Sequence, residues 1–527
     1  MGKEYSPDGA DRSDRRRERE MNESTIKSKR SLLPALAVAL TLGGLHQLLF
    51  YGLLPGLSVP LFLLLLYAYF WTFGREAVRP QGPAGYLLAA AVLLLALTYA
   101  LFDNPVFFVL NLLALPTLTA WHLTYMLGDR RRSWHDLRLI PDAFGHMLKQ
   151  TVLHVPDVFA LFRRRPQEGD AANGEGDSAL RQVLYGLAFA VPLLAVVLML
   201  LLSADGVLRT MAGEIPAWFG NLSLGDGGIR LLWALATGGF LFTYLGGFRS
   251  PKRRPPVQGP KLAEHFEPVH PVQTTDPLSK LQPLPVVTLL VALNLVYVLF
   301  VAFQFSYLFG AWQGVLPESS SYADYARSGF GELIGVTFIN FGVLLLGLYA
   351  TLRGEGRIRR ALDGLHLLLA LCSVAMLGSA FSRLLLYEEA YGYTRLRFLV
   401  HAFMIFLFAV LVLFALCIRM RRIPLGRVLV VLGVAAYLAV NYACMDRVIT
   451  RLNLDRQQAA EATIDLEYLL DLSDDAVPVL IERAEPDSEL DRRLREKAQS
   501  ELGENVPWQS WNLSDWQARE QLNRYVN

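Results

Sequence analysis

Long apolar runs alternate with shorter polar segments along this chain. Each run contains roughly 18 to 25 residues, enough for a helix rising 1.5 Å per residue to cross a hydrocarbon core of about 30 Å. Because backbone polar groups find no water in lipid, each run is expected to be helical. The pattern predicts an all-α, polytopic membrane bundle of about eleven transmembrane helices, at about 31–53, 57–74, 84–102, 105–127, 182–203, 229–247, 284–309, 332–352, 365–387, 398–418 and 428–445.

Polar stretches separate these spans into groups. Between Trp134 and Phe159, apolar residues recur at helical spacings, which favours helices lying on the inner membrane face or packing beneath the bundle. The predicted order is a disordered basic cytoplasmic tail at 1–30, four transmembrane helices in 31–127, a cytoplasmic amphipathic and linker segment at 128–181, two transmembrane helices in 182–247, a Pro-rich cytoplasmic linker at 248–283, five transmembrane helices in 284–445 and an acidic extracytoplasmic helical domain at 446–527.

Lysine and arginine residues concentrate in alternate loops. The segments predicted to face inward contain Arg75 and Arg79, Arg130–Arg132, Arg163–Arg165, Arg249–Arg254, Arg353–Arg360 and Arg419–Arg427. The loops predicted to face outward contain few basic residues. The positive-inside rule therefore places the N-terminus in the cytoplasm, and an odd number of spans then places the C-terminus outside.

Composition agrees with a membrane protein and narrows the chemistry. The 527 residues are 53% hydrophobic and 19% charged, whereas a soluble chain carries about 25% charged residues. The arginine clusters follow topology, so no nucleic-acid partner is expected. The three cysteines lie in apolar runs without metal-ligand spacing, and the usual hydrolase, zinc-protease and P-loop motifs are absent from the sequence. No cofactor is therefore predicted.

Polar residues near the outer ends of five spans form a candidate site. A charge at the centre of a span costs about 2.5–3.5 kcal/mol on insertion scales. Polar residues that lie at the same depth in several spans are therefore candidates for a common site. We expect Glu332 and Arg383 to pair; the alternatives are that Arg383 snorkels to the border and that the amides serve helix packing. This outer polar cluster consists of Gln304, Tyr307, Glu332, Arg383, Tyr387, Arg397, His401 and Asn441, with Asn294 and Asn340 nearer the midplane.

A polar and aromatic stretch ending at Glu332 re-enters the membrane beside this cluster. Tyr322, Tyr325 and Gly329 share a helical face at spacings of three and four, and Arg327 adds a cation between them. An interfacial aromatic belt with a close-packing glycine would give the same pattern. Both interpretations stay open.

The segment after the last span is hydrophilic, with interrupted helical periodicity. Ser473, followed by two aspartates, is typical of a helix N-terminus with acidic residues in its first turn. Three tryptophans between Trp508 and Tyr525 could pack in a small core or lie at the lipid interface.

Several motifs of this chain resemble those of one bacterial membrane family. They are Gln304 and Tyr307 with Leu308-Phe309-Gly310, Tyr322-Ala-x-Tyr-Ala-Arg-x-Gly-Phe-x-Glu332, Asn340, Arg383, Tyr387, Tyr391-Gly-x-Thr394 with Arg397, and Asp465-x-x-Tyr-Leu469 followed by Leu472-Ser473 and Asp475-Ala476. That family is catalogued as domain of unknown function 4173, related to number 4153. The resemblance covers roughly residues 180–520 and implies a multi-pass membrane protein without an established activity.

These observations leave two classes of function open. The first is a non-enzymatic protein of the bacterial inner membrane, which transports a small solute or lipid or has a partner or regulatory role through the outer polar cluster. Its partners would be the lipid bilayer and an envelope protein or lipid substrate. The second is a membrane enzyme acting on a lipid-linked envelope substrate, with Glu332, Arg383, Arg397 and His401 at its site. Glu388 and Glu389 lie at the border with the wrong arginine spacing for a Glu-Glu protease.

Overall fold

The structure is a computed structural model, and the part of the chain that it describes is helical without strands. The residues described are 32–75, 82–128, 133–136, 138–162, 226–251, 282–312, 330–349, 356–420, 422–460, 465–503 and 505–527. The predicted tail at 1–30, the predicted span at 182–203 and the border residues Tyr322, Tyr325 and Arg327 lie outside these ranges.

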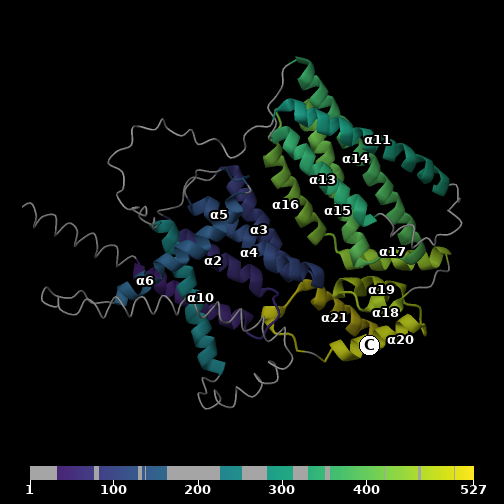
Figure 1. The fold of residues 1–527 in the computed structure, drawn as a ribbon. Helices are drawn as coiled ribbons and strands as arrows, with labels where there is room; N and C mark the ends of the chain where they lie inside the picture. Colours follow the sequence, from purple (N-terminus) through teal and green to yellow (C-terminus); the bar gives the residue numbers. More distant parts are fainter. Residues whose placement is uncertain are drawn as a thin grey trace, which may run out of the picture. The chain divides into compact units, whose positions relative to one another are not determined.

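Most predicted spans coincide with a helix (Figure 1). A first helix covers Leu32–Phe50. The others are α2 (Ser58–Phe73), α3 (Pro83–Leu101), α4 (Pro105–Leu127), α5 (Leu139–Gly145), η1 (His146–Gln150), α6 (Thr151–Phe162), α10 (Asp226–Arg249), α11 (Pro283–Trp312), α13 (Phe330–Tyr349), α14 (Gly356–Tyr391), α15 (Arg395–Arg419), α16 (Leu425–Asn441), α17 (Met445–Ala460), α18 (Leu466–Leu470), η2 (Asp474–Ala476), α19 (Val477–Arg483), α20 (Glu489–Glu501), η3 (Trp508–Ser510) and α21 (Leu513–Val526).

Seven of the described helices are long and apolar enough to cross a membrane, or eight if α16 and α17 form one bent span. α2 and the segment Gly335–Gly347 within α13 are apolar but shorter. The predicted all-α class is therefore confirmed for the described residues, and the helices are compatible with a multi-pass membrane protein. The predicted number of eleven spans is not reached among them.

The last predicted span ends earlier than the hydropathy pattern indicated. The apolar run continues to residue 445, but α16 ends at Asn441 and α17 begins at Met445 with a bend of 59°. Cys444, between the two helices, has a φ of 47°, in the left-handed region that interrupts a right-handed helix. A local backbone conformation therefore separates α16 from α17.

One compact unit contains the described residues within Met1–Gly52, Leu65–Val78 and Gly145–Lys252. In it, the Leu32–Phe50 helix and α10 touch through their backbones. A Cβ built on Gly238 would lie 2.7 Å from the backbone oxygen of Ala39, and one built on Gly43 would collide with the carbonyl of Ala234. Small residues allow this close approach between helices in a membrane.

The second half of the amphipathic segment belongs to the same unit and packs on α10. His154 of α6 is buried, with Nε2 lying 3.0 Å from the carbonyl oxygen of Ser250 and Nδ1 lying 2.8 Å from that of Gln150. The ring of His146 stacks on Phe248 of α10 at 3.9 Å between centroids. For these residues the structure favours protein packing, one of the two alternatives left by the sequence.

The second unit contains Leu53–Leu64, Arg79–Phe144 and Arg253–Asn527, again as far as these are described. Its larger core joins α11, α13, α14 and α15 around fully buried side chains such as Leu290, Leu344, Leu369 and Phe414. A second core gathers α17 to α21 and includes Phe107 from the start of α4. Figure 1 shows these C-terminal helices at the ends of α14 to α16.

Candidate functional site

An ion pair between the buried Asp446 and the partly exposed Arg395 joins the start of α15 to the start of α17. Arg395 is the first residue of α15, and its Nε donates to Oδ1 of Asp446 at 2.9 Å while Nη2 donates to Oδ2 at 2.7 Å. Asp446 is fully buried and lies in the first turn of α17, where the helix dipole favours a carboxylate. Two parallel charge-assisted hydrogen bonds fix the relative orientation of both groups.

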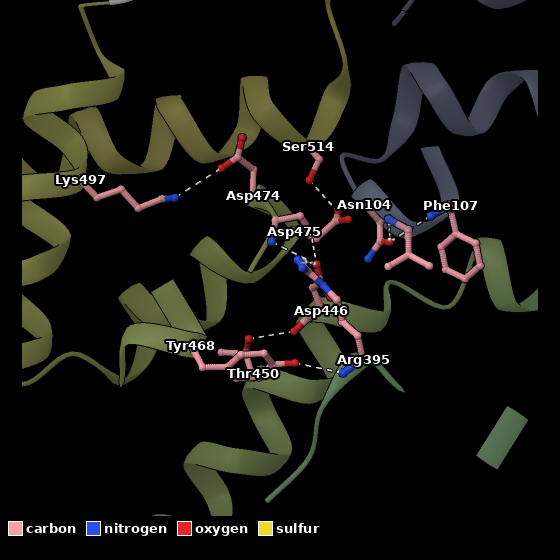
Figure 2. A network of polar contacts seen from close by, with 12 residues as sticks. Asn104, Phe107, Arg395, Asp446, Thr450, Tyr468, Asp474, Asp475, Lys497 and Ser514 are labelled. Carbon is pink, nitrogen blue, oxygen red and sulfur yellow. Dashed lines mark hydrogen bonds and ion pairs between the residues drawn. The ribbon is translucent and has the colours of Figure 1, made fainter. Parts of the chain in front are cut away.

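Two more residues complete the surroundings of this ion pair, as Figure 2 shows in part. Oδ2 of Asp446 accepts hydrogen bonds from the backbone N–H of Ser473 at 3.0 Å and from its hydroxyl at 2.6 Å. The phenolic oxygen of Tyr468 accepts the backbone N–H of Arg395 at 3.0 Å. We call Arg395, Asp446, Tyr468 and Ser473 the docking network, because it fastens α17, α18 and η2 to the end of α15.

Ser473 also illustrates how the tertiary structure redirects a local signal. The prediction that a helix starts after Ser473 is confirmed, because η2 begins at Asp474 and α19 follows it. The Ser473 side chain makes no capping bond to its own helix, however. Its hydroxyl instead donates to Oδ2 of Asp446 at 2.6 Å, on another helix.

The loop between α14 and α15 is held by α17. Gly392 has a φ of 78°, and a Cβ there would lie 2.6 Å from Oδ1 of Asn453. Asn453 accepts the backbone N–H of Tyr393 at 2.8 Å and donates to its carbonyl at 2.9 Å. Arg456 donates to the carbonyls of Glu389 and Ala390, which caps the C-terminus of α14. The motif from Tyr391 to Thr394 thus forms part of the surface on which α17 packs.

Carboxylates gather where the C-terminal helices meet the α3–α4 loop. Asp475 is buried and accepts the hydroxyl of Ser514 at 2.6 Å (Figure 2). Burial raises the pKa of Asp475, and the Ser514 hydrogen bond opposes the rise. Asp103 keeps solvent-exposed surface, but desolvation of its carboxyl and the charges of Asp475 and Asp515 raise its pKa to about 6, against the lowering effects of the Asp474 backbone N–H and Lys497.

We expect the Asp103→Asn variant to be more stable than the parent protein at pH 8 and equally stable at pH 4. A carboxyl whose pKa is raised on folding contributes stability below its unfolded pKa of 3.8, and this contribution is lost as the pH rises through about 6. Asparagine remains neutral throughout. Thermal melting in detergent between pH 4 and pH 8 measures the difference in Tm, with the exposed Glu467→Gln variant as the control. A difference for Asp103→Asn that does not change with pH would contradict the assignment.

A polar network of amides and hydroxyls links α3, α4 and α16 within the bundle. Asn111 donates to Oδ1 of Asn441 at 2.7 Å and to Oγ1 of Thr98 at 3.0 Å, and it accepts the Tyr437 hydroxyl at 2.7 Å. Asn441 donates to the carbonyl of Tyr437 at 2.9 Å. Such bonds hold transmembrane helices together at about 1–2 kcal/mol each in model peptides.

His401 of α15 lies against Glu388 near the end of α14. Its Nδ1 is 3.2 Å from Oε1 of Glu388, which is almost fully buried, and the ring of Phe381 packs edge-on against the imidazole. Among the described residues, Nε2 of His401 and Oε2 of Glu388 have no hydrogen-bond partner. A carboxylate that orients an imidazole in this way is also found in catalytic dyads.

The remaining predicted residues have separate partners. Arg397 lies 4.2 Å above the ring of Tyr387 and donates to the carbonyls of Tyr391 and Gly392. Asn340 is buried in α13 and donates to the hydroxyl of Ser373 on α14 at 2.9 Å. Arg383 lies half-buried on α14.

Several predicted side chains are outside the described part of the structure. Gln304 and Tyr307 lie on α11 and Glu332 lies on α13, but only their helices are described. The expected pairing of Glu332 with Arg383 therefore stays a prediction. Among the described members of the outer polar cluster, Arg397 contacts Tyr387, whereas His401 and Asn441 bond to residues outside the cluster.

Arg395 and Asp446 were not predicted as site residues from the sequence. Asp446 directly follows an apolar run and Arg395 precedes one, so both look like ordinary border charges. A usable signal did exist, because Tyr468, Ser473 and Asp475 all belong to the motifs on which the family resemblance rests. Among the described residues, no group of three or more His, Cys, Asp or Glu side chains could hold a metal ion.

A comparison with protein-family models assigns the chain to a family. The model of the family described as a domain of unknown function, DUF4153, matches residues 89–483, and the chain belongs to this family. The number 4173, to which the motifs were assigned, stays an expectation. No curated protein and no solved structure matches the chain. The match includes the docking network and the helices that it joins.

Proposed function

We propose that the chain is a non-enzymatic protein of the bacterial inner membrane that presents α17 to α21 outside the membrane to a partner protein. The observation that carries this proposal is the ion pair of Arg395 with the buried Asp446, in which both carboxylate oxygens are bonded. Arg395 and Asp446, which lie between the bundle and the C-terminal helices, bond to each other and so hold the two parts together. A rigidly docked outer domain supports presentation to a partner better than chemistry at that position.

Transport of a small solute or lipid receives less support from the deeper polar residues. Asn294 donates to the carbonyls of Leu290 and Leu365 at 2.8 and 3.0 Å, which ties α11 to α14. Asn340 likewise ties α13 to α14 through Ser373. Both amides are buried and act between helices, as expected of packing contacts.

The C-terminal helices carry a surface suited to a protein partner. Trp516 of α21 is 49% exposed beside a hollow of about 410 Å³. Charged residues of both signs line this hollow, namely Arg447, Arg451, Glu482, Glu520 and Arg524. Exposed tryptophan and arginine are enriched at protein interfaces and among the residues that dominate binding energy.

In-cell crosslinking tests the partner role. A photoreactive amino acid replaces Trp516 in the full chain, and a second variant carries it at Leu502, which is exposed at the end of α20. We expect a discrete protein adduct at position 516 and none at position 502. Lipid adducts alone at position 516, or equal adducts at both positions, would contradict the proposal.

Cysteine accessibility in intact cells tests the topology. Single cysteines replace Ser320, Ser510, Gln304 and Asn340 in a chain without its three native cysteines, and a membrane-impermeant thiol reagent is added. We expect labelling at positions 320 and 510 and none at 340. Labelling at 340 would favour a transport path, and an unreactive position 510 beside a reactive position 320 would place the C-terminal helices elsewhere.

An enzyme acting on a lipid-linked envelope substrate is the second candidate, favoured by the Glu388–His401 pair, whose Nε2 has no hydrogen-bond partner among the described residues. Complementation of a deletion strain separates the candidates. The partner role predicts that His401→Ala restores function when its membrane abundance matches the parent, whereas Asp446→Ala does not. A His401→Ala protein that is abundant but inactive would favour the enzyme.

A further inference from the structure

A large hollow lies in the second unit toward the end of α15 that is remote from the docking network. It has a volume of about 1080 Å³ and is bordered by α4, α13, α15, α16 and the segment before α5. This volume is at the upper end of the range for small-molecule sites, about 300–1,000 Å³. Among the described residues, no member of the outer polar cluster and no residue of α17 to α21 belongs to its lining.

The walls of this hollow are mainly apolar. They include Phe341 of α13, Phe406 of α15 and Val434 of α16. Trp121 of α4 also lines the hollow, and its indole N–H is already bonded to the carbonyl of Trp134 at 3.2 Å, so it presents apolar ring surface. A Cβ built on Gly433 of α16 would meet nothing within 4 Å, which shows that α16 borders open space there.

Positive charge concentrates at the mouth of the hollow. Arg138, Arg427 and His135 belong to its lining, and Asp136 balances one of them by accepting from Nε of Arg138 at 3.2 Å. Among the described residues, Nδ1 of His135 has no hydrogen-bond partner. Arg419, the last residue of α15, and Arg422 lie outside the lining of the hollow.

The first turn of α16 adds backbone hydrogen-bond donors. The helix has 17 residues, and Pro424 at its N-cap makes no side-chain capping bond. The first intrahelical bond runs from the N–H of Val428 to Pro424 at 3.1 Å, so the N–H groups of residues 425–427 precede it. Together with Arg138 and Arg427 they form a setting for an anion.

We propose that this hollow binds an anionic phospholipid, with the phosphate at Arg138, Arg427 and the first turn of α16 and an acyl chain along the apolar walls. Apolar surface and a basic mouth occur in one cavity, which matches the two parts of such a lipid. Under the topology proposed above, the mouth faces the cytoplasmic leaflet, where anionic lipids are enriched.

Lipid titration of the purified full-length protein, followed by native mass spectrometry, tests this site. The probes are phosphatidylglycerol and phosphatidylcholine, with inorganic phosphate as a competitor. We expect phosphatidylglycerol to bind at least tenfold more tightly than phosphatidylcholine. Arg427→Gln should weaken phosphatidylglycerol binding about tenfold, because a charge-assisted hydrogen bond is worth about one order of magnitude in affinity.

Two pairs of variants locate the lipid. Gly433→Leu places a side chain in the hollow and should abolish the binding of phosphatidylglycerol. Gly378→Leu, at an open position of α14 outside the lining, should leave this binding unchanged. Arg422→Gln is the matched charge control for Arg427→Gln. Unchanged binding in Gly433→Leu, equal loss in Arg422→Gln and Arg427→Gln, or full displacement by phosphate would each overturn the proposal, the last by indicating a free phosphate site.

Discussion

Replacing Asp446 by alanine is expected to lower the free energy of unfolding by about 3 kcal/mol, the lower end of the cost of breaking a buried ion pair, because the Arg395 side chain left without its partner is 23% exposed. Arg395 would lose both of its carboxylate bonds, and the N–H and hydroxyl of Ser473 would lose their acceptor. We expect the C-terminal helices to detach before the bundle unfolds. Thermal melting in detergent and limited proteolysis of residues 446–527 measure both effects.

The control for this change lies on the same helix. Asp455 of α17 pairs with Arg483 at 2.6 Å, but both side chains are partly exposed to solvent. Such a pair is worth about 0–1 kcal/mol, so Asp455→Ala should leave Tm nearly unchanged. Equal losses in Asp446→Ala and Asp455→Ala would show that the buried pair has no special part in docking.

Replacing Gly238 by leucine is expected to destabilise the first unit by about 3 kcal/mol, the upper end of the usual cost of overpacking. The new side chain would have to displace the backbone of the Leu32–Phe50 helix at Ala39 and Leu40, since a Cβ at residue 238 already lies 2.7 Å from both. A backbone cannot move aside as a side chain can. The readouts are Tm and the fraction of monodisperse protein after extraction.

The neighbouring glycine provides the matched control. A Cβ on Gly239 would meet nothing within 4 Å, so Gly239→Leu should be tolerated and should gain helix propensity of about 1 kcal/mol. If both leucine variants behave alike, the close approach between these two helices does not stabilise the unit.

Helical spans were the most predictable part of this protein. A continuous apolar run in lipid leaves the backbone no alternative to helical hydrogen bonds, so positions such as α3, α4 and α15 follow from hydropathy. Span ends were less predictable. α16 stops at Asn441 although the apolar run continues, and the left-handed conformation at Cys444 separates it from α17.

The candidate site was predictable in part. The shared depth of polar residues in the spans predicted Arg397, His401 and Asn441 as site residues. In the structure each of them has a polar or aromatic partner. The partners themselves could not be predicted, because Asn111 lies 330 residues from Asn441 and hydropathy does not encode pairing across helices. Arg395 and Asp446 were not predicted, because a charged residue beside an apolar run gives the same sequence pattern whether its side chain is solvated or buried.

The sequence by itself determined that the chain is helical, apolar enough for several membrane passages, and asymmetric in its basic loops, because each of these follows from local composition and spacing. Only the tertiary structure decided that Asp446 is buried against Arg395, that Ser473 donates to that carboxylate, and that Gly238 touches another backbone. These outcomes depend on which surfaces are excluded from solvent once distant segments meet. That exclusion is a property of the packed chain, so it converts ordinary border residues into the network that fastens the C-terminal helices.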